Sequence, residues 1–309
     1  MKSKAILPTS FVNAWALLLS SITTTSRIPT CDGLIPASPR EQTSRAIASI
    51  KSAIQDHREQ QQQQNADSTK QKPCRLFVDY IIPLPPETLE TDVDPWPGGL
   101  AQMYPYAEDI LKEILQGVVD VPQGVCSTQV LSDSDCCGLF IQESQTSPSE
   151  DIAAILFPSV DQLNTIEQVD NMVGSERTLI LFNKQFQRPS DFGMGFFSNN
   201  GSQKAQTLIF DQYKYGFAFQ EFACRGEDTK LLYEHPKGWY SCVICDEDVD
   251  AGRQELQLLP PTSSLDRRPT YKELETKINE ILPEPLWMRK MNEAESKGLK
   301  FQRGGGSGK

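Results

Sequence analysis

The polar residues best placed for chemistry follow two apolar runs and one Trp-Pro-Gly-Gly segment. Asp79 lies in the run over residues 75–85, and Asn183 and Gln185 follow the run over 178–182. If both runs are parallel strands, their carboxyl ends meet at the edge where open α/β sheets bind ligands. The sequence therefore predicts a cleft with polar and aromatic walls. Its six expected lining residues are Asp79, Trp96, Gly98, Gly99, Asn183 and Gln185.

Each of these residues also has a purely structural interpretation. Asp79 can cap a nearby backbone N–H at the end of its strand. Trp96 can pack as a lid residue, and Asn183 can hold a loop in place. No residue set in the chain demands a particular reaction, so we predict no catalytic residues.

The cysteines and histidines do not form a recognisable reactive group. Cys242 and Cys245 form a CxxC motif, but its flanks are typical of a strand, on which positions three apart face opposite sides. Redox motifs of this form lie at helix N-termini, and a zinc site needs four ligands. His57 and His235 have no serine or cysteine elbow beside them, which argues against a hydrolase triad. We therefore predict neither a metal site nor a cofactor.

The charge distribution argues against a nucleic-acid partner. The chain of 309 residues has a net charge of −11, of which residues 1–40 contribute +3 and residues 287–309 contribute +4, leaving −18 for residues 41–286. Phosphate binding needs clustered Lys and Arg, which this acidic body lacks. The eight cysteines are irregularly spaced, which favours free thiols in a reducing compartment.

The two ends of the chain differ from its body. Residues 1–40 combine a basic start, a short apolar run and a Ser/Thr-rich continuation, which together indicate a plastid-targeting presequence of the signal-plus-transit type. Residues 284–309 are basic and then glycine-rich, and we expect a flexible tail. This tail is the one part expected to contact an anionic membrane surface. Residues 41–283 remain as one domain, which we expect to be soluble.

Strand and helix patterns alternate through the first two thirds of this domain, which predicts an α/β fold with a mainly parallel sheet and helices on both faces. The expected helices cover 39–60, 100–116 and 162–173, with a short one over 203–211. The expected strands cover 75–85, 126–131, 138–142, 152–157 and 178–182.

The last third changes character. Four short strands linked by turns predict an antiparallel meander that extends the sheet, over 217–224, 230–234, 239–245 and 255–259. A closing helix is expected to start at Pro269 or Thr270.

Several motifs taken in order resemble the plastid and cyanobacterial family catalogued as domain of unknown function 1995. They include Arg45 in the first helix, the RLFVDYIIPLP strand, the Trp96-Pro97-Gly98-Gly99 segment, the LILFNKQF strand and the Arg268-Pro269-Thr270 helix start. The resemblance covers residues 40–283 and implies a plastid-associated α/β domain of unestablished biochemistry. Some plant members are linked to photosystem II assembly, and some carry an adenylate-kinase-like domain, which this chain lacks. The long acidic loop and the insertion at 198–202 depart from the family pattern.

Two functions remain open at this point. The first is a non-catalytic plastid accessory protein whose partners are photosynthetic complex subunits or assembly factors. The second is an enzyme or a nucleotide- or phosphate-binding module that uses the predicted cleft. The acidic loop between the first strand and Gly98-Gly99 repels phosphate and favours the accessory protein.

Overall fold

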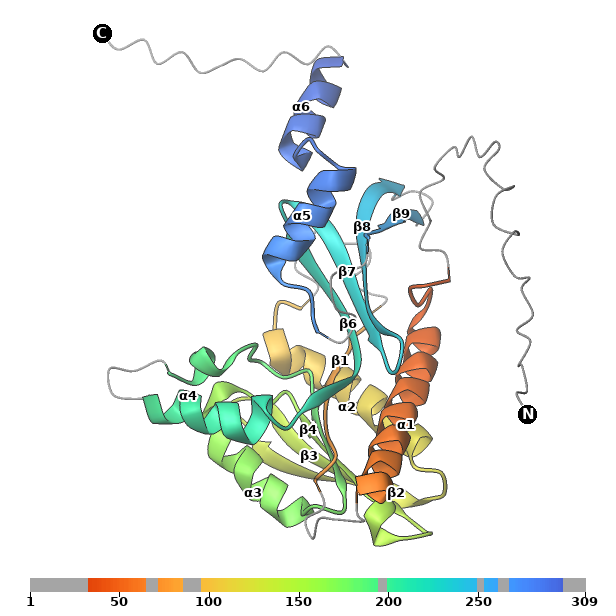
Figure 1. Cartoon of the computed structure of the whole chain (residues 1–309), viewed down its shortest axis with the longest axis vertical. Helices are drawn as coiled ribbons and strands as arrows, with labels where there is room; N and C mark the ends of the chain where they lie inside the picture. The colour runs from red at the N-terminus through yellow and green to blue at the C-terminus, as the bar shows by residue number, and fades with distance from the viewer. Residues whose placement is uncertain are drawn as a thin grey trace, which may run out of the picture.

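The computed structural model describes residues 33–64, 72–85, 96–193, 199–248, 253–260 and 267–296 (Figure 1). Residues 1–32 of the predicted presequence, most of the acidic loop and the last residues of the predicted tail lie outside these ranges. The predicted presequence boundary at residue 40 falls inside the fold, because a helix begins at Pro39 and Ile35 is buried in a hydrophobic core. None of the helices within them is long and apolar enough to span a membrane.

Strand β1 (Arg75–Asp79) lies at the centre of the sheet, as its continuous apolar run predicts. In the described residues the sheet has nine strands in the order β2-β3-β4-β5-β1-β6-β7-β8-β9. β1 pairs in parallel with β5 (Thr178–Phe182) on one side and β6 (Lys214–Cys224) on the other. β5 also pairs in parallel with β4 (Ile152–Leu156). All five residues of β1 are buried, since helices cover both of its faces.

Antiparallel strands flank this parallel centre on both sides. β7 (Glu227–Glu234), β8 (Gly238–Asp248) and β9 (Arg253–Leu258) form the predicted meander beyond β6. On the other side, β2 (Pro122–Ser132) and β3 (Cys137–Ser144) form a hairpin that pairs with β4. The sequence predicts an antiparallel extension in the C-terminal half alone. The turn between β2 and β3 is too short for the crossover that a parallel pair needs.

Helices α1 (Pro39–Gln64) and α2 (Gly99–Val118) cover one face of the sheet, and α3 (Leu163–Val173) and α4 (Asn199–Ala205) cover the other (Figure 1). α1 begins at a proline, which the first turn of a helix tolerates. Its buried stripe recurs every three or four residues and consists of Ala46, Ile50, Ala53 and Ile54. The short helix predicted over 203–211 is α4 followed by a π-helical turn at Gln206–Phe210.

Alternation along β1 divides its side chains between two cores. Leu76 and Val78 pack in the core under α1 and α2, whereas Phe77 packs in the core under α3. A third core joins the meander to α5 (Tyr271–Ile281). α5 starts directly after Thr270, one of its two predicted starting residues, and Thr270 caps the helix in a capping box with Glu273.

The C-terminal segment differs from the predicted flexible tail, because helix α6 occupies Leu286–Ser296. Arg289 on α6 pairs with Glu227, which is 2% exposed at the start of β7. The prediction treated residues 284–309 as one tail and so did not distinguish this helix from the glycine-rich residues that follow it. Those residues, 297–309, are not among the described ones.

Candidate functional site

The carboxyl ends of β1, β5 and β6 bring three polar side chains together. Asp79 is the last residue of β1, Lys184 follows β5 by two residues, and Gln220 lies in β6 beyond the partner of Asp79. Lys184 Nζ donates to both carboxylate oxygens of Asp79, at 3.3 and 3.1 Å. Gln220 Nε2 donates to Asp79 Oδ2 at 2.5 Å. Both oxygens of this carboxylate are therefore bound to neighbouring side chains.

Lys184 is a buried cation, and its side chain is 1% exposed. Its third contact is to the hydroxyl of Tyr215, at 3.1 Å. The ammonium also lies 4.8 Å from the ring centroid of Phe77 and 5.1 Å from that of Tyr215, which are cation–π distances. Burial alone lowers the pKa of Lys184, but the charge of Asp79 and the contact with Tyr215 outweigh it, so the pKa is raised. Lys184 therefore stays protonated and is unsuited to act as a nucleophile.

The network continues to the segment before α5. Arg268 Nε donates to Gln220 Oε1 at 3.0 Å, and its guanidinium carbon lies 5.8 Å from the ring centroid of Phe222. Three strands and the start of α5 are thus joined by a chain of contacts that runs from Lys184 through Asp79 and Gln220 to Arg268. Each of these side chains has a protein partner, so the network stabilises the fold by holding these elements together.

Asn183 holds the backbone where β1 ends. Its Oδ1 accepts from the backbone N–H of Tyr80 at 2.6 Å, and its Nδ2 donates to the carbonyl of Tyr80 at 2.9 Å. Its own N–H donates to the carbonyl of Val78 at 2.8 Å. Asn183 has a φ of +50°, a conformation that asparagine tolerates better than most residues. Gln185 donates to the carbonyl of Asn183 at 2.6 Å. Asn183 thus has the loop-holding role that was the alternative to a cleft residue.

The sheet separates the other three predicted residues from Asp79. Trp96 packs against the core under α1 and α2, and its ring centroid is 5.5 Å from that of Tyr106. Gly98 and Gly99 begin α2 on that same face. The carboxylate of Asp79 points to the opposite face, where its partner Lys184 lies over the ring of Phe77. The structure therefore brings Asp79, Asn183 and Gln185 to one edge and leaves the Trp-Pro-Gly-Gly segment on the other face.

Sequence reasoning missed Lys184, Tyr215, Gln220 and Arg268. One signal was present, because Lys184 directly follows the Asn183 that was selected. A lysine that follows a buried parallel strand lies close to the carboxyl end of the neighbouring strand in the sheet, where an aspartate or glutamate can pair with it. The sequence contains no such signal for Gln220. A register shift next to Val78 in the pairing of β1 with β6 decides which side of the sheet the Gln220 side chain faces.

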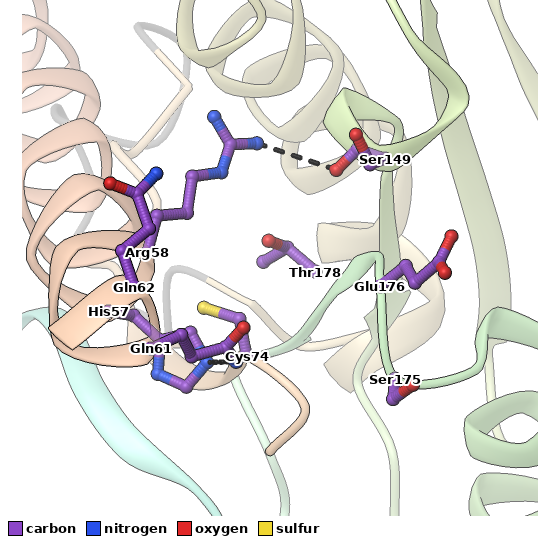
Figure 2. A pocket seen from close by; sticks show the side chains of 9 residues that line it. All are labelled: His57, Arg58, Gln61, Gln62, Cys74, Ser149, Ser175, Glu176 and Thr178. Atoms are coloured by element: carbon purple, nitrogen blue, oxygen red, sulfur yellow. Dashed lines mark hydrogen bonds between the residues drawn. The ribbon is translucent and has the colours of Figure 1, made fainter. Parts of the chain in front are cut away.

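A polar pocket of about 400 Å³ lies at the other end of the parallel strands (Figure 2). Cys74 precedes β1 and Thr178 begins β5, so the pocket opens at the amino ends of these strands. The length of β1 separates it from Asp79 by on the order of 15 Å. Its nine lining residues are His57, Arg58, Gln61, Gln62, Cys74, Ser149, Ser175, Glu176 and Thr178.

His57 and Arg58 in this pocket have protein partners, and Cys74 is buried. His57 Nε2 lies 3.0 Å from the carbonyl oxygen of Lys72 and 2.7 Å from Nε2 of Gln61, and burial lowers the pKa of His57. Burial raises the pKa of the Cys74 thiol, which disfavours the thiolate that a nucleophile requires. Arg58 reaches across the opening to the carbonyl of Ser149, at 3.4 Å (Figure 2). The pocket can hold a small polar molecule but does not activate a nucleophile.

A second His-centred group joins α1 to the meander. Asp56 Oδ2 lies 2.7 Å from Nε2 of His235. Ser49 is nearby, but its hydroxyl donates to the carbonyl of Gly216 at 2.5 Å and accepts from the backbone N–H of His235 at 2.7 Å. The hydroxyl therefore contacts the main chain and not the imidazole, which is not the geometry of a triad.

The CxxC motif lies on β8, as its flanks predict. Cys242 is buried, and the side chain of Cys245 is outside the described part. Within the described ranges, no three His, Cys, Asp or Glu side chains are grouped so that they could hold a metal ion.

Comparison with known proteins gives one match. The model of the family described as domain of unknown function (DUF1995) matches residues 36–276, which span α1 to β9 and the first half of α5. A search of curated proteins finds no match.

Proposed function

Because this chain belongs to the DUF1995 family, with a mixed α/β fold whose strand-end network is internally satisfied, we propose that it is a non-catalytic plastid accessory protein. It acts by binding other proteins, and it aids the assembly or maintenance of photosynthetic complexes, photosystem II in particular. Its partners are subunits of those complexes or their assembly factors.

One observation carries this proposal. At the edge of the sheet where an α/β enzyme would bind its substrate, Lys184 and Gln220 occupy both oxygens of Asp79. A catalytic carboxylate or lysine needs a free atom directed at the substrate. Here the charged groups stabilise the fold, which leaves the surface to carry the function.

The plastid location rests on the first forty residues, whose basic, apolar and hydroxylated segments are typical of a targeting presequence. Fusing residues 1–40 to a fluorescent reporter tests this part on its own. We expect plastid fluorescence, and a reporter that stays in the cytosol would contradict the location.

Deletion of the gene in its source organism tests the function. We expect photosystem II to accumulate to a lower level while the transcripts of its subunits stay unchanged, and we expect the full-length gene to restore it. Normal accumulation of photosynthetic complexes in the deletion strain would overturn the proposal.

The pocket at the amino ends of the strands favours a second candidate, a module that binds a small polar ligand. Its size of about 400 Å³ falls in the range of small-molecule sites. A thermal-shift screen against nucleotides and metabolites discriminates between the two functions, because a ligand that binds the folded state alone raises Tm. A shift of several degrees that Arg58→Ala abolishes would favour this second candidate.

A further inference from the structure

Strand β2 is one edge of the sheet and has an unusual composition for that position. It extends over eleven residues, Pro122–Ser132, about twice the average length of a strand. Its sequence, PQGVCSTQVLS, contains no Lys, Arg, Asp or Glu. An edge strand presents unpaired backbone N–H and C=O groups, and natural proteins normally guard such edges with charges, prolines or short length.

The opposite edge of the same sheet has these protections. β9 has six residues, and its sequence, RQELQL, contains residues of both charge signs. Register shifts interrupt both edges, one in the pairing of β9 with β8 and two in the pairing of β2 with β3. The two edges of one sheet therefore differ in length and in charge, and β2 is the one open to another strand.

The central part of β2 is regular and exposed. Ser127 to Val130 pair without interruption with β3. Pro122, the positive φ of Gly124 (+62°) and a register shift interrupt the strand before this run, and a second register shift follows it between Val130 and Ser132. The side chain of Val125 is 82% exposed and that of Val130 is 60% exposed. Among the described strands β3 is the one partner of β2, so the outer backbone groups of this run have no strand to pair with.

We propose that β2 pairs antiparallel with β2 of a second copy of this chain, which joins two sheets into one continuous sheet. Antiparallel pairing of a strand with itself creates the two-fold symmetry common in homodimers. A second copy fits this edge because the strand is uncharged, so that self-pairing places no like charges opposite each other. The chain as a whole has a net charge of −11, which disfavours contact between copies through acidic surfaces.

The pairing register is centred on the regular run of β2. With the two-fold axis at Thr128, Thr128 lies opposite Thr128 of the second copy and Ser127 lies opposite Gln129 of the second copy, all within the run that pairs without interruption with β3. Residues at equal distances from Thr128 alternate to the same face, so each pair meets on one side of the joined sheet. The inference is independent of the proposed function.

The test is the mass of the full chain in solution, measured by light scattering over a range of concentrations. We expect a dimer that dissociates on dilution. Val130→Lys adds a guarding charge at an exposed position and should halve the mass at concentrations where the unmodified chain is dimeric. The matched control is Met172→Lys on α3, where the native side chain is 56% exposed, and this variant should remain a dimer.

Hydrogen exchange of the unmodified chain gives a second measurement that needs no variant. We expect the β2 amides to be protected at high concentration and to exchange faster on dilution, while the β9 amides do not change. A chain that is monomeric at every concentration would overturn the proposal. So would a dimer that survives Val130→Lys, or one whose concentration-dependent protection lies outside β2.

Discussion

Lys184 Nζ lies 3.1 Å from Asp79 Oδ2, and the two side chains are 1% and 10% exposed. The pair joins β1 to the segment after β5 at the edge of the sheet where the sequence predicts a binding cleft. Because the pair is buried, we expect the loss of either charge to lower the free energy of unfolding. A buried charge is stable only while its partner and its hydrogen bonds are present.

Replacing Lys184 with Met should lower the free energy of unfolding by about 3–5 kcal/mol, because it leaves the Asp79 carboxylate buried without its cation. Adding Asp79→Asn to this variant should restore much of the loss, since the uncompensated charge is then gone. Urea unfolding of the two single variants and the double variant measures this coupling.

The matched control is Lys51→Met, which breaks the exposed pair with Asp120, whose side chains are 40% and 79% exposed. Its effect should stay below about 1 kcal/mol. Equal losses for Lys184→Met and Lys51→Met would show that the buried pair contributes nothing specific.

Two substitutions of Asn183 separate the contribution of its backbone conformation from that of its hydrogen bonds. Asn183→Ala should cost about 2–4 kcal/mol, because it removes two hydrogen bonds to Tyr80 and places a Cβ-bearing, non-polar residue at positive φ. Asn183→Gly loses the same hydrogen bonds but tolerates the φ of +50°. We therefore expect the glycine variant to be the more stable of the two in denaturant unfolding, and the reverse order would rule out the backbone contribution.

The α5 capping box predicts a pH dependence. The backbone N–H and hydroxyl of Thr270, followed by Arg267, lower the pKa of Glu273 to about 2, from an ordinary value of 4.5. A carboxyl whose pKa is lower in the folded chain contributes stability above its unfolded pKa and loses it as the pH falls. This contribution should therefore be complete above about pH 4.5 and disappear toward pH 2.

Glu273→Gln should accordingly lower Tm near neutral pH and flatten the decline of Tm between pH 4.5 and 2. Glu280→Gln on the same helix is the control, because its carboxylate lies outside the capping box. An acid decline as steep in Glu273→Gln as in the unmodified chain would refute the assignment.

Local pattern was sufficient to predict most of the elements. The unbroken apolar runs of β1 and β5 indicated strands covered on both faces, and Pro269-Thr270 marked the start of α5. The family resemblance is confirmed by the match over residues 36–276. These features depend on neighbouring residues, whose periodicity and capping chemistry are visible in the chain.

The site could not be predicted in the same way, because it depends on long-range geometry. Lys184 and Asp79 are 105 residues apart, and a lysine after a strand is ordinarily exposed. The Trp96 segment follows β1 along the chain, after the acidic loop, which suggested the same edge of the sheet, but α2 lies on the face opposite to the Asp79 carboxylate. The face on which a connection returns is decided by the packing of whole helices.

The most direct test of the accessory role is complementation of the deletion strain by the double variant Asp79→Asn, Lys184→Met. The variant removes both charges at the strand ends, so an enzyme that used them would lose its activity. Provided that the variant accumulates to the level of the unmodified protein, we expect it to restore photosystem II accumulation fully. A stable, normally abundant double variant that fails to restore photosystem II would show that these charges perform chemistry, and it would contradict the account.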